Sequence, residues 1–232
     1  MHQNKVEYCP ILNESIPELP VRSSFYNLPP IGTGTSLSEC LTSYISRLAL
    51  AHSVSLGNFF EYALVPELKK NYLKALPIVG PASQLASGGF KYKIKNINSL
   101  GETATDWVNV LQKLTLRDDL SCLTFLKLSK VLSRYFNTYK FQTWCPFCLE
   151  AMKENNSQIY YPLLWSMADV KVCYIHKTPI LETCPNCSKA FYPLARKMNP
   201  GFCSRCQIWL GMPLTKPLCT GSAEVLIGLK VR

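Results

Sequence analysis

The sequence predicts a mainly α-helical N-terminal region followed by two small cysteine-rich units. Apolar residues recur at helical spacing between residues 36 and 135, and no strand–glycine loop–helix motif interrupts them. Four ligand pairs then follow, each with two intervening residues: Cys145 with Cys148, Cys173 with His176, Cys184 with Cys187, and Cys203 with Cys206. Eight such ligands are what two closed, four-coordinate zinc sites need, so we expect a helix-turn-helix-type domain followed by tandem zinc fingers or ribbons.

Composition and charge narrow the class of protein. Of the 232 residues, 47% are apolar, which is ordinary for a globular protein, and the net charge is +10. A basic balance favours DNA, RNA or another polyanion as partner, although a plain solvated surface explains it equally well. The polar start and the lack of a long apolar run predict a cytoplasmic protein with no membrane segment. In a reducing compartment, cysteine pairs indicate metal or redox sites and not structural disulfides.

The chain begins with a proline-rich stretch, residues 1–35, which we expect to form an extended arm along either a partner or the chain's own core. Residues 36–76 carry the predicted helix-turn-helix-type plan. Ser36 and Glu39 have the spacing of a capping box at the start of its first helix, and Ser55 is a cap candidate for the second. Plain helical packing without DNA contact explains the same pattern.

Each helix of this region is expected to bury one apolar stripe. Arg47 falls outside the stripe of the first helix, and Pro66 suits the start of a third helix over residues 67–76. The inward residues of the first helix are Leu37, Leu41, Tyr44, Ile45, Leu48 and Ala49. Those of the second are Leu56, Phe59, Phe60 and Ala63.

Residues 77–99 contain the glycines and prolines of a loop or linker, and residues 100–140 carry two further predicted helices. One spans residues 103–114 and the other spans residues 119–135. The inward residues of the former are Trp107, Val110, Leu111 and Leu114. Those of the latter are Leu120, Leu123, Thr124, Leu128, Val131 and Leu132.

The ligand pairs follow two spacing formulas. The first two pairs give C-x2-C-x24-C-x2-H, and the last two give C-x2-C-x15-C-x2-C, which lies in the four-cysteine zinc range. Two residues between ligands let a tight turn aim both side chains at one ion. We expect sequential pairing, in a first finger at residues 144–182 and a second at residues 183–212, with residues 213–232 as a tail. A cross-braced pairing would use the same side chains.

Zinc in such sites is expected to be structural. Both ligand sets are full, so no position stays open for water or substrate. A redox role lacks a βαβ context, and His176 with the ligand spacing favours zinc over an iron–sulfur cluster. Neither paired carboxylates with metal-site spacing nor a serine nucleophile motif occurs in the sequence, so we do not expect an enzyme.

Two groups of basic residues are candidate nucleic-acid contacts. They are Lys91, Lys93, Lys95, Arg196, Lys197 and Arg205. The three lysines of the first group alternate with Tyr92 and Ile94, which suits phosphate contacts beside a stacking ring. The same pattern also suits a short edge strand guarded by lysines, and this structural interpretation is the stronger one.

The order of these motifs resembles the TniQ/TnsD family of transposon target-selection proteins. The resemblance extends from about Ser36 to Leu210, and it departs from the family at Tyr174, where members usually carry proline. It rests on Cys145-Pro-Phe-Cys148-Leu149-Glu150, Tyr160-Tyr-Pro-Leu-Leu-Trp165, Cys173-Tyr-Ile-His176, Cys184-Pro-Asn-Cys187 and, in the helical region, Glu39-Cys-Leu-Thr-Ser-Tyr-Ile-Ser-Arg-Leu-Ala49.

The resemblance implies a non-enzymatic adaptor in Tn7-like transposition that contains two structural zinc ions. Its implied partners are a TnsC-type AAA+ ATPase, a Cas effector with guide RNA, and DNA, with a homodimer as an open alternative. The implied location is the nucleoid-associated cytoplasm of a bacterium. The chain stops soon after the second finger, which favours the short, CRISPR-associated type. An independent zinc-finger regulator that reads DNA sequence is the alternative, for which Asn58 and Glu61 in the second helix are a poor base-reading set.

Overall fold

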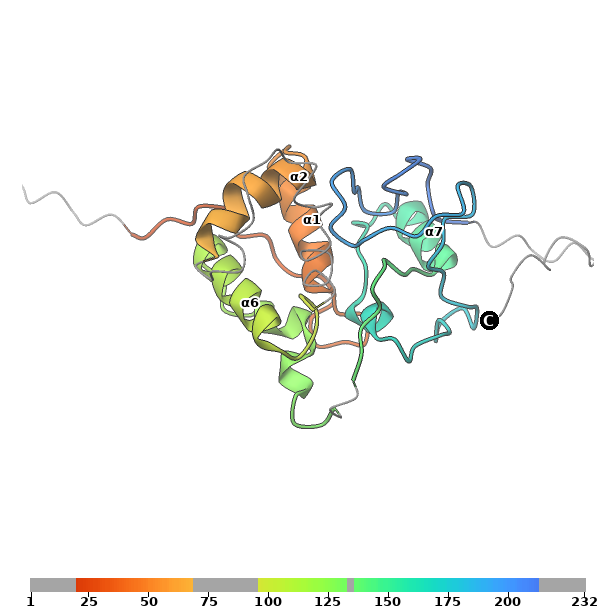
Figure 1. Cartoon of the computed structure of the whole chain (residues 1–232), viewed down its shortest axis with the longest axis horizontal. Helices are drawn as coiled ribbons and strands as arrows, with labels where there is room; N and C mark the ends of the chain where they lie inside the picture. Colours follow the sequence, from red (N-terminus) through yellow and green to blue (C-terminus); the bar gives the residue numbers. More distant parts are fainter. Residues whose placement is uncertain (1–19, 69–95, 133–135, 213–232) are drawn as a thin grey trace, which may run out of the picture.

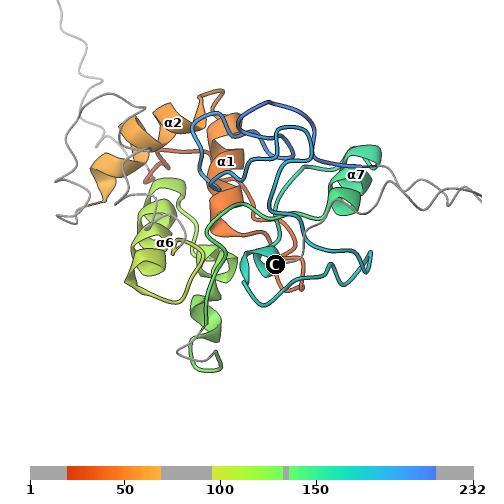
Figure 2. The same cartoon turned by 45° about the vertical axis from the view of Figure 1, so that its right-hand side comes forward.

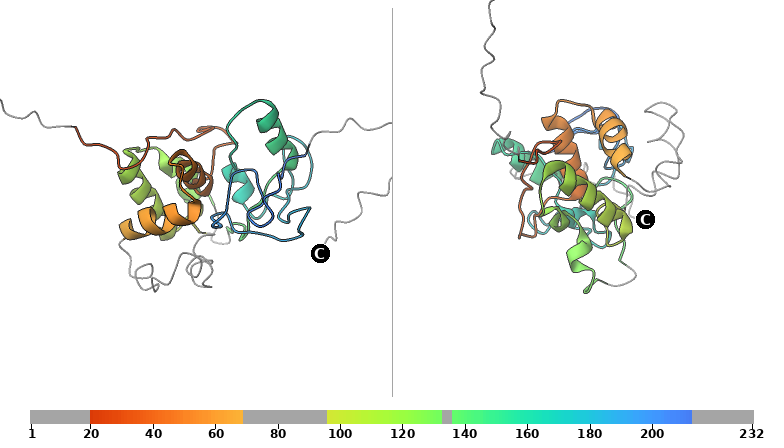
Figure 3. Two further views of the ribbon diagram at one scale, coloured as in Figure 1. Left: turned by 90° about the horizontal axis from the view of Figure 1, so that it is seen from above. Right: turned by 90° about the vertical axis from the view of Figure 1, so that its left-hand side faces the viewer.

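The computed structural model describes residues 20–68, 96–132 and 136–212. Helices and turns dominate these residues, and their β pairing is limited to isolated bridges. Figure 1 shows the helices of the N-terminal region on one side and, on the other, the loops of the C-terminal region together with the helix labelled α7. Figure 3 shows the same division from above. The predicted mainly helical class is confirmed over the described residues.

The N-terminal region is built around two helical segments joined by a short turn. Helix α1 spans Leu41–Ala51, and the second segment starts with α2, Leu56–Asn58. That segment continues as a π-helical turn, Phe59–Leu64, and a 3-10 turn, Val65–Glu67. The Ser55 side chain accepts the Asn58 N–H at 3.4 Å, which confirms the predicted cap of this segment. The third predicted helix lies outside the described residues beyond position 68.

The predicted capping box at the start of α1 is wrong. The helix begins after Cys40, whose side chain makes no capping bond, and the Ser36 hydroxyl instead hydrogen-bonds with the Tyr174 hydroxyl at 2.9 Å. Glu39 is fully buried and forms an ion pair with Arg47. Arg47, expected outside the apolar stripe, is only 3% exposed because other segments cover that face of the helix.

The buried Glu39–Arg47 pair connects three parts of the chain. Glu39 accepts hydrogen bonds from the Ser43 hydroxyl at 3.0 Å and the Ile31 N–H at 3.3 Å. Arg47 donates to the Gln158 side chain at 2.6 Å, in the loop that precedes the second ligand pair. Burial raises the pKa of Glu39, and the positive charge of Arg47 opposes this shift. The pair therefore fixes the arm and the cysteine-rich region to α1.

The described part of the N-terminal arm lies along the chain's own core. The Phe25 N–H donates to the Leu114 carbonyl at 2.9 Å, and the Asn27 amide donates to the Thr115 carbonyl at 3.0 Å. The Tyr44 hydroxyl reaches the Leu28 carbonyl at 3.0 Å. Of the two placements that the sequence left open, the structure adopts the intramolecular one for residues 25–31.

Helix α6, Glu102–Thr115, closes the other side of the helical core and confirms the helix predicted over residues 103–114. Trp107, Leu111 and Leu114 are buried as expected, and Trp107 stacks on Phe60 with ring centroids 5.0 Å apart. Val108 is buried, whereas the sequence predicted Val110 as the buried residue. The buried face of α6 is therefore slightly rotated from the predicted one.

The helix predicted over residues 119–135 is wrong. The chain forms two 3-10 turns there, Leu120–Leu123 and Phe125–Leu128, separated by an extended Thr124. The Thr124 hydroxyl donates to the Ser121 carbonyl at 2.9 Å, a local bond that competes with helical pairing. Val131, expected inward, is 81% exposed as a result.

The C-terminal region joins the helical region through hydrogen bonds around Tyr161. The Cys40 N–H donates to the Tyr161 carbonyl at 2.9 Å, and the Tyr161 N–H donates to the Ser43 hydroxyl at 3.0 Å. A short 3-10 turn, Leu163–Ser166, follows Pro162. Among the described residues, helices capable of crossing a membrane are absent.

Candidate metal centre

The first ligand pair lies at the start of a helix. Cys145 is the residue that precedes α7, Pro146–Glu154, and Pro146 occupies its first position, where a proline costs no hydrogen bond. The Leu149 N–H donates to the Cys145 carbonyl at 3.2 Å, so Cys148 lies on the first turn of α7 beside Cys145. Sequence spacing predicted a close pair here, and the helix supplies its geometry.

The other three ligand pairs share one turn, which we call the knuckle. In each knuckle the carbonyl of the first cysteine accepts an N–H from four residues later, and its own N–H donates to the carbonyl five residues later. The first bonds are those of Lys177, Ser188 and Gln207, at 2.8, 2.9 and 2.9 Å. The second reach Thr178, Lys189 and Ile208, at 2.8, 3.1 and 2.9 Å. Each knuckle therefore holds two ligand side chains on one side of a closed turn.

One residue of each knuckle adopts a left-handed conformation. Lys177, Ser188 and Gln207, directly after the second ligand, have φ angles of 55°, 52° and 57°. Glycine is the usual residue for this conformation, and none of the three is glycine. The sequence therefore carried no sign of the turn, which depends on the two hydrogen bonds that close it.

The structure groups the ligands sequentially into two clusters. The first cluster is Cys145, Cys148, Cys173 and His176, and the second cluster is Cys184, Cys187, Cys203 and Cys206. Within each cluster the sulfur and imidazole nitrogen atoms lie within 4.8 Å of one another. The pairing of first with second and third with fourth is the one expected, and the cross-braced pairing is not adopted.

The distances within both clusters fit a zinc ion. In the first cluster, the His176 Nδ1 atom lies 3.5 Å from the Cys145 sulfur and 3.2 Å from the Cys148 sulfur. In the second, the sulfurs of Cys184 and Cys206 are 3.6 Å apart, and those of Cys187 and Cys203 are 3.8 Å apart. A tetrahedron with Zn–S bonds of about 2.3 Å has sulfur–sulfur edges of about 3.8 Å. Disulfide bonding is excluded, since S–S bonds are about 2.05 Å long.

Each cluster also offers a thiolate near neutral pH, the form of cysteine that binds metal. A hydrogen bond from Cys148 lowers the pKa of Cys145 to about 4. In the second cluster, the Ile208 backbone N–H lowers the pKa of Cys206 to about 6. Burial raises the pKa of Cys184 to about 12 in the same cluster, so a metal ion must displace its proton.

Both clusters could therefore hold one zinc ion each, with all four ligands supplied by the chain. A zinc ion with four protein ligands has no open position for water or substrate, so its contribution is to folding and positioning. The residues that the ion would fix in place are the turns around it: the start of α7 and the three knuckles.

Side-chain contacts of Trp209 place the second cluster against α7. The Trp209 indole N–H donates to the Glu150 carboxylate at 2.6 Å, and this bond lowers the pKa of Glu150. Lys153 lies over the Trp209 ring, 5.1 Å from its centroid. A Cβ atom at Gly201 would meet the same ring at 2.2 Å, so only glycine fits there. This contact was not predicted, because no spacing pattern in the sequence links Trp209 to Glu150.

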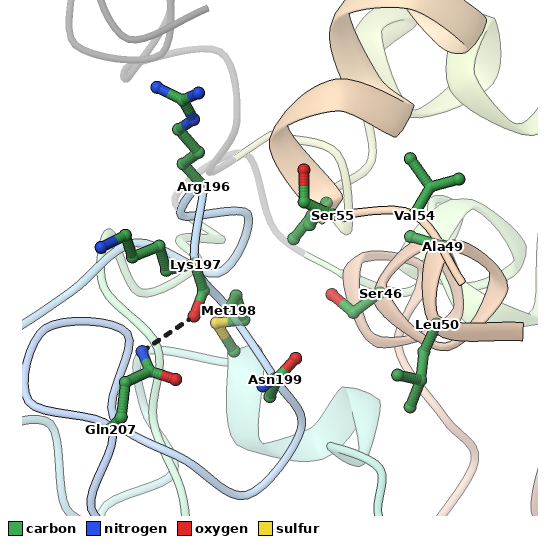
Figure 4. Close-up of a pocket in the computed structure, with 11 residues that line it drawn as sticks. Ser46, Ala49, Leu50, Val54, Ser55, Arg196, Lys197, Met198, Asn199 and Gln207 are labelled. Carbon is green, nitrogen blue, oxygen red and sulfur yellow. Dashed lines mark hydrogen bonds between the residues drawn. The ribbon is translucent and has the colours of Figure 1, made fainter. Parts of the chain in front are cut away.

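The candidate nucleic-acid contacts are only partly described. Lys91, Lys93 and Lys95 lie outside the described residues. Arg196 and Lys197 are exposed and adjacent on the loop between the last two knuckles, and Arg205 is exposed inside the fourth ligand pair. The loop that carries Arg196 forms one side of a cleft, and the end of α1 with the start of α2 forms the other (Figure 4).

Comparison with models of known protein families matches this chain to one of them. The model of the family described as TniQ matches residues 30–180, about two thirds of the chain. The match covers α1, α6, α7 and all four ligands of the first cluster, and it ends before the second cluster begins. A search of curated proteins returned no match to this chain.

Proposed function

Because this chain belongs to the TniQ family, whose role is target selection in Tn7-like transposition, we propose that it is a non-enzymatic adaptor. It links an RNA-guided Cas effector, or target DNA itself, to a TnsC-type AAA+ ATPase. The observation that carries this proposal is the family match over residues 30–180, which includes both the helical region and the first cluster.

The metal clusters support an adaptor over an enzyme. Each cluster has a complete set of four protein ligands, so a zinc ion bound in it is structural. Surfaces held in place by the ions then carry the function. Such surfaces suit a protein that joins other molecules.

The second helical segment of the N-terminal region favours the adaptor over an independent regulator that reads DNA sequence. Its exposed residues are Asn58, Tyr62 and Pro66, and the segment from Leu56 to Glu67 contains no lysine or arginine. Recognition helices usually contact bases and phosphates with arginine or lysine, together with asparagine or glutamine. We propose that nucleic-acid contact involves basic residues outside this segment, with Arg205 and the lysines Lys91, Lys93 and Lys95 as candidates.

A pull-down tests the adaptor function. The tagged, zinc-loaded chain is mixed with a TnsC-type ATPase from the same genome. The ATPase is first assembled on double-stranded DNA with ATP. We expect clearly more retention of the chain on the ATPase filament than on bare DNA at the same salt concentration. Absence of retention would contradict the adaptor function. A specific footprint of the isolated chain on a defined duplex would instead support the sequence-reading regulator.

A further inference from the structure

A cleft of about 600 Å³ separates the end of α1 and the start of α2 from the loop between the last two knuckles. Figure 4 shows residues of both walls, and the blue loops of the second cysteine unit lie beside α1 and α2 in Figures 1 and 2. The two walls come from the helical region and the second cysteine unit, which are separated by more than a hundred residues in sequence. The cleft is thus a product of how these regions pack.

The helical wall of the cleft is mostly apolar. Its apolar residues are Leu50, Val54, Leu56 and Ala49, its polar residues are Ser46 and Ser55, and Met198 lines the facing side. Leu50 is 59% exposed and Val54 is 39% exposed, although α1 buries nine of its 11 residues. Exposed apolar side chains that gather in a concave surface mark sites of interaction with other molecules.

The facing wall is basic. Arg196 and Lys197 line it, both are exposed, and neither has an ion-pair partner within the described part of the chain. Aspartate and glutamate are absent from the described lining of the cleft. The combination of an apolar floor with unpaired cations at the rim is complementary to an acidic molecule with an apolar side chain.

The basic rim is held in place by one packing contact and by hydrogen bonds from Gln207. A Cβ atom at Gly57 would lie 2.5 Å from the Arg196 Cγ atom, so the stem of this arginine packs directly on the α2 backbone. The Gln207 side chain donates to the Lys197 carbonyl at 3.0 Å and to the Cys203 carbonyl at 3.0 Å. The second bond ties the rim to a ligand of the second cluster, so a zinc ion there would order the cleft.

We propose that this cleft binds a short segment of a partner protein in which a large apolar side chain stands next to acidic residues. The inference rests on the proposed adaptor function, which requires a surface that holds another protein. The apolar side chain contacts Leu50 and Val54, and the acidic residues pair with Arg196 and Lys197. A nucleic-acid strand fits less well, because single-stranded sites stack bases on aromatic rings and no aromatic residue lines the described cleft.

Peptide selection on the full-length, zinc-loaded chain tests the proposal without any transposition protein. A random peptide library displayed on phage is panned against the immobilised chain, and enriched peptides are synthesised with a fluorescent label. We expect enrichment of leucine, phenylalanine or methionine beside aspartate or glutamate. Leu50→Asp and Arg196→Glu should each weaken binding by at least about tenfold in anisotropy titrations. Val131→Asp, which changes an even more exposed apolar residue outside the cleft, should leave binding unchanged.

Three outcomes would overturn the proposal. Selection could give no peptide whose binding depends on Leu50. Alternatively, labelled single-stranded RNA could bind with the same dependence on Leu50 and Arg196, which would make nucleic acid the occupant. A dimer in sedimentation that Leu50→Asp dissolves would make a second copy the occupant. Since the selection involves no ATPase, its failure is distinct from a failure of the pull-down described above.

Discussion

The two metal clusters differ in how they are built into the fold. The first cluster has one ligand pair on the first turn of α7 and one on a knuckle, whereas the second cluster is made of two knuckles. Trp144 and Leu181, which flank the first cluster, exchange backbone hydrogen bonds of 2.9 and 2.8 Å. The second cluster packs on this frame through side chains, among them Trp209 on Glu150 and Phe191 on Trp144.

Family membership follows the same division. The TniQ match includes the whole first cluster and stops before Cys184, the first ligand of the second. The first cluster therefore lies within the matched residues, and the second lies outside them, in the region that forms one wall of the cleft beside α1 and α2. We infer that the first zinc ion is required for the fold of the chain and the second for the position of the basic rim.

The largest expected effect is that of Cys148→Ser, which removes a ligand of the first cluster. Zinc binding in small metal domains contributes about 10–16 kcal/mol of apparent folding free energy, and here the start of α7 and the contacts around Tyr161 depend on it. We expect loss of the first ion, with a large loss of helical circular dichroism and of cooperative unfolding. Metal content by mass spectrometry and a thermal melt check this.

Cys122→Ser is the matched control for that variant. Cys122 lies outside both clusters, and its thiol donates to the Asp119 carbonyl at 2.8 Å, a bond that a serine hydroxyl can also make. This variant should keep both ions and the wild-type melting temperature. If Cys148→Ser behaves like Cys122→Ser, the first cluster is not a zinc site.

Cys184→Ser should have a smaller effect, limited to the second cysteine unit. We expect loss of one zinc ion while α1, α6 and α7 keep their helical signal, because α1 and α6 both pack on the turn Leu120–Leu123 and α7 starts in the first cluster. Metal content checks the loss of the ion, and amide hydrogen exchange measured segment by segment checks the structure. Protection from exchange should be lost within residues 183–212 and kept in residues 41–51. Global unfolding of Cys184→Ser, as severe as that of Cys148→Ser, would remove the distinction between the clusters.

The sequence predicted the clusters better than it predicted their setting. Ligand spacing alone gave the eight residues, because two intervening residues allow little besides a tight turn. It left a cross-braced grouping open, and the structure adopts the expected sequential one. Helix α6 was also predicted to within one residue at each end, since its apolar stripe is regular. These are features that depend on local sequence.

The features that were missed depend on distant partners. Glu39 has the spacing of a capping residue, and only the fold shows that Arg47 and Gln158 meet it in the core. Trp209 and Glu150 are 59 residues apart, and their contact has no periodic signal. Position in the fold, and not propensity, decided each of these cases.

Arg47→Met tests how strongly the first cluster's surroundings depend on the buried ion pair. Removing the cation leaves the Glu39 carboxylate buried and unpaired, which typically costs about 3–5 kcal/mol. We expect a loss of that order in urea unfolding, with both zinc ions retained. The double variant Glu39→Gln with Arg47→Met should recover much of the loss, since a neutral pair needs no counter-charge. Equal stability of the single and double variants would mean that the pair contributes through packing alone.

The smallest expected effect is that of Trp209→Phe, which keeps the aromatic ring and removes the N–H that reaches Glu150 at 2.6 Å. The loss of a hydrogen bond to a charged group costs about 1.5–3 kcal/mol, so global stability should fall less than in Arg47→Met. The second cluster should nevertheless release its zinc faster to a colourimetric chelator, because its unit separates from α7 more often. Glu150→Gln is the matched control, since an amide oxygen can still accept the indole N–H. Faster zinc release in Glu150→Gln than in Trp209→Phe would show that charge, and not the hydrogen bond, holds the second unit on α7.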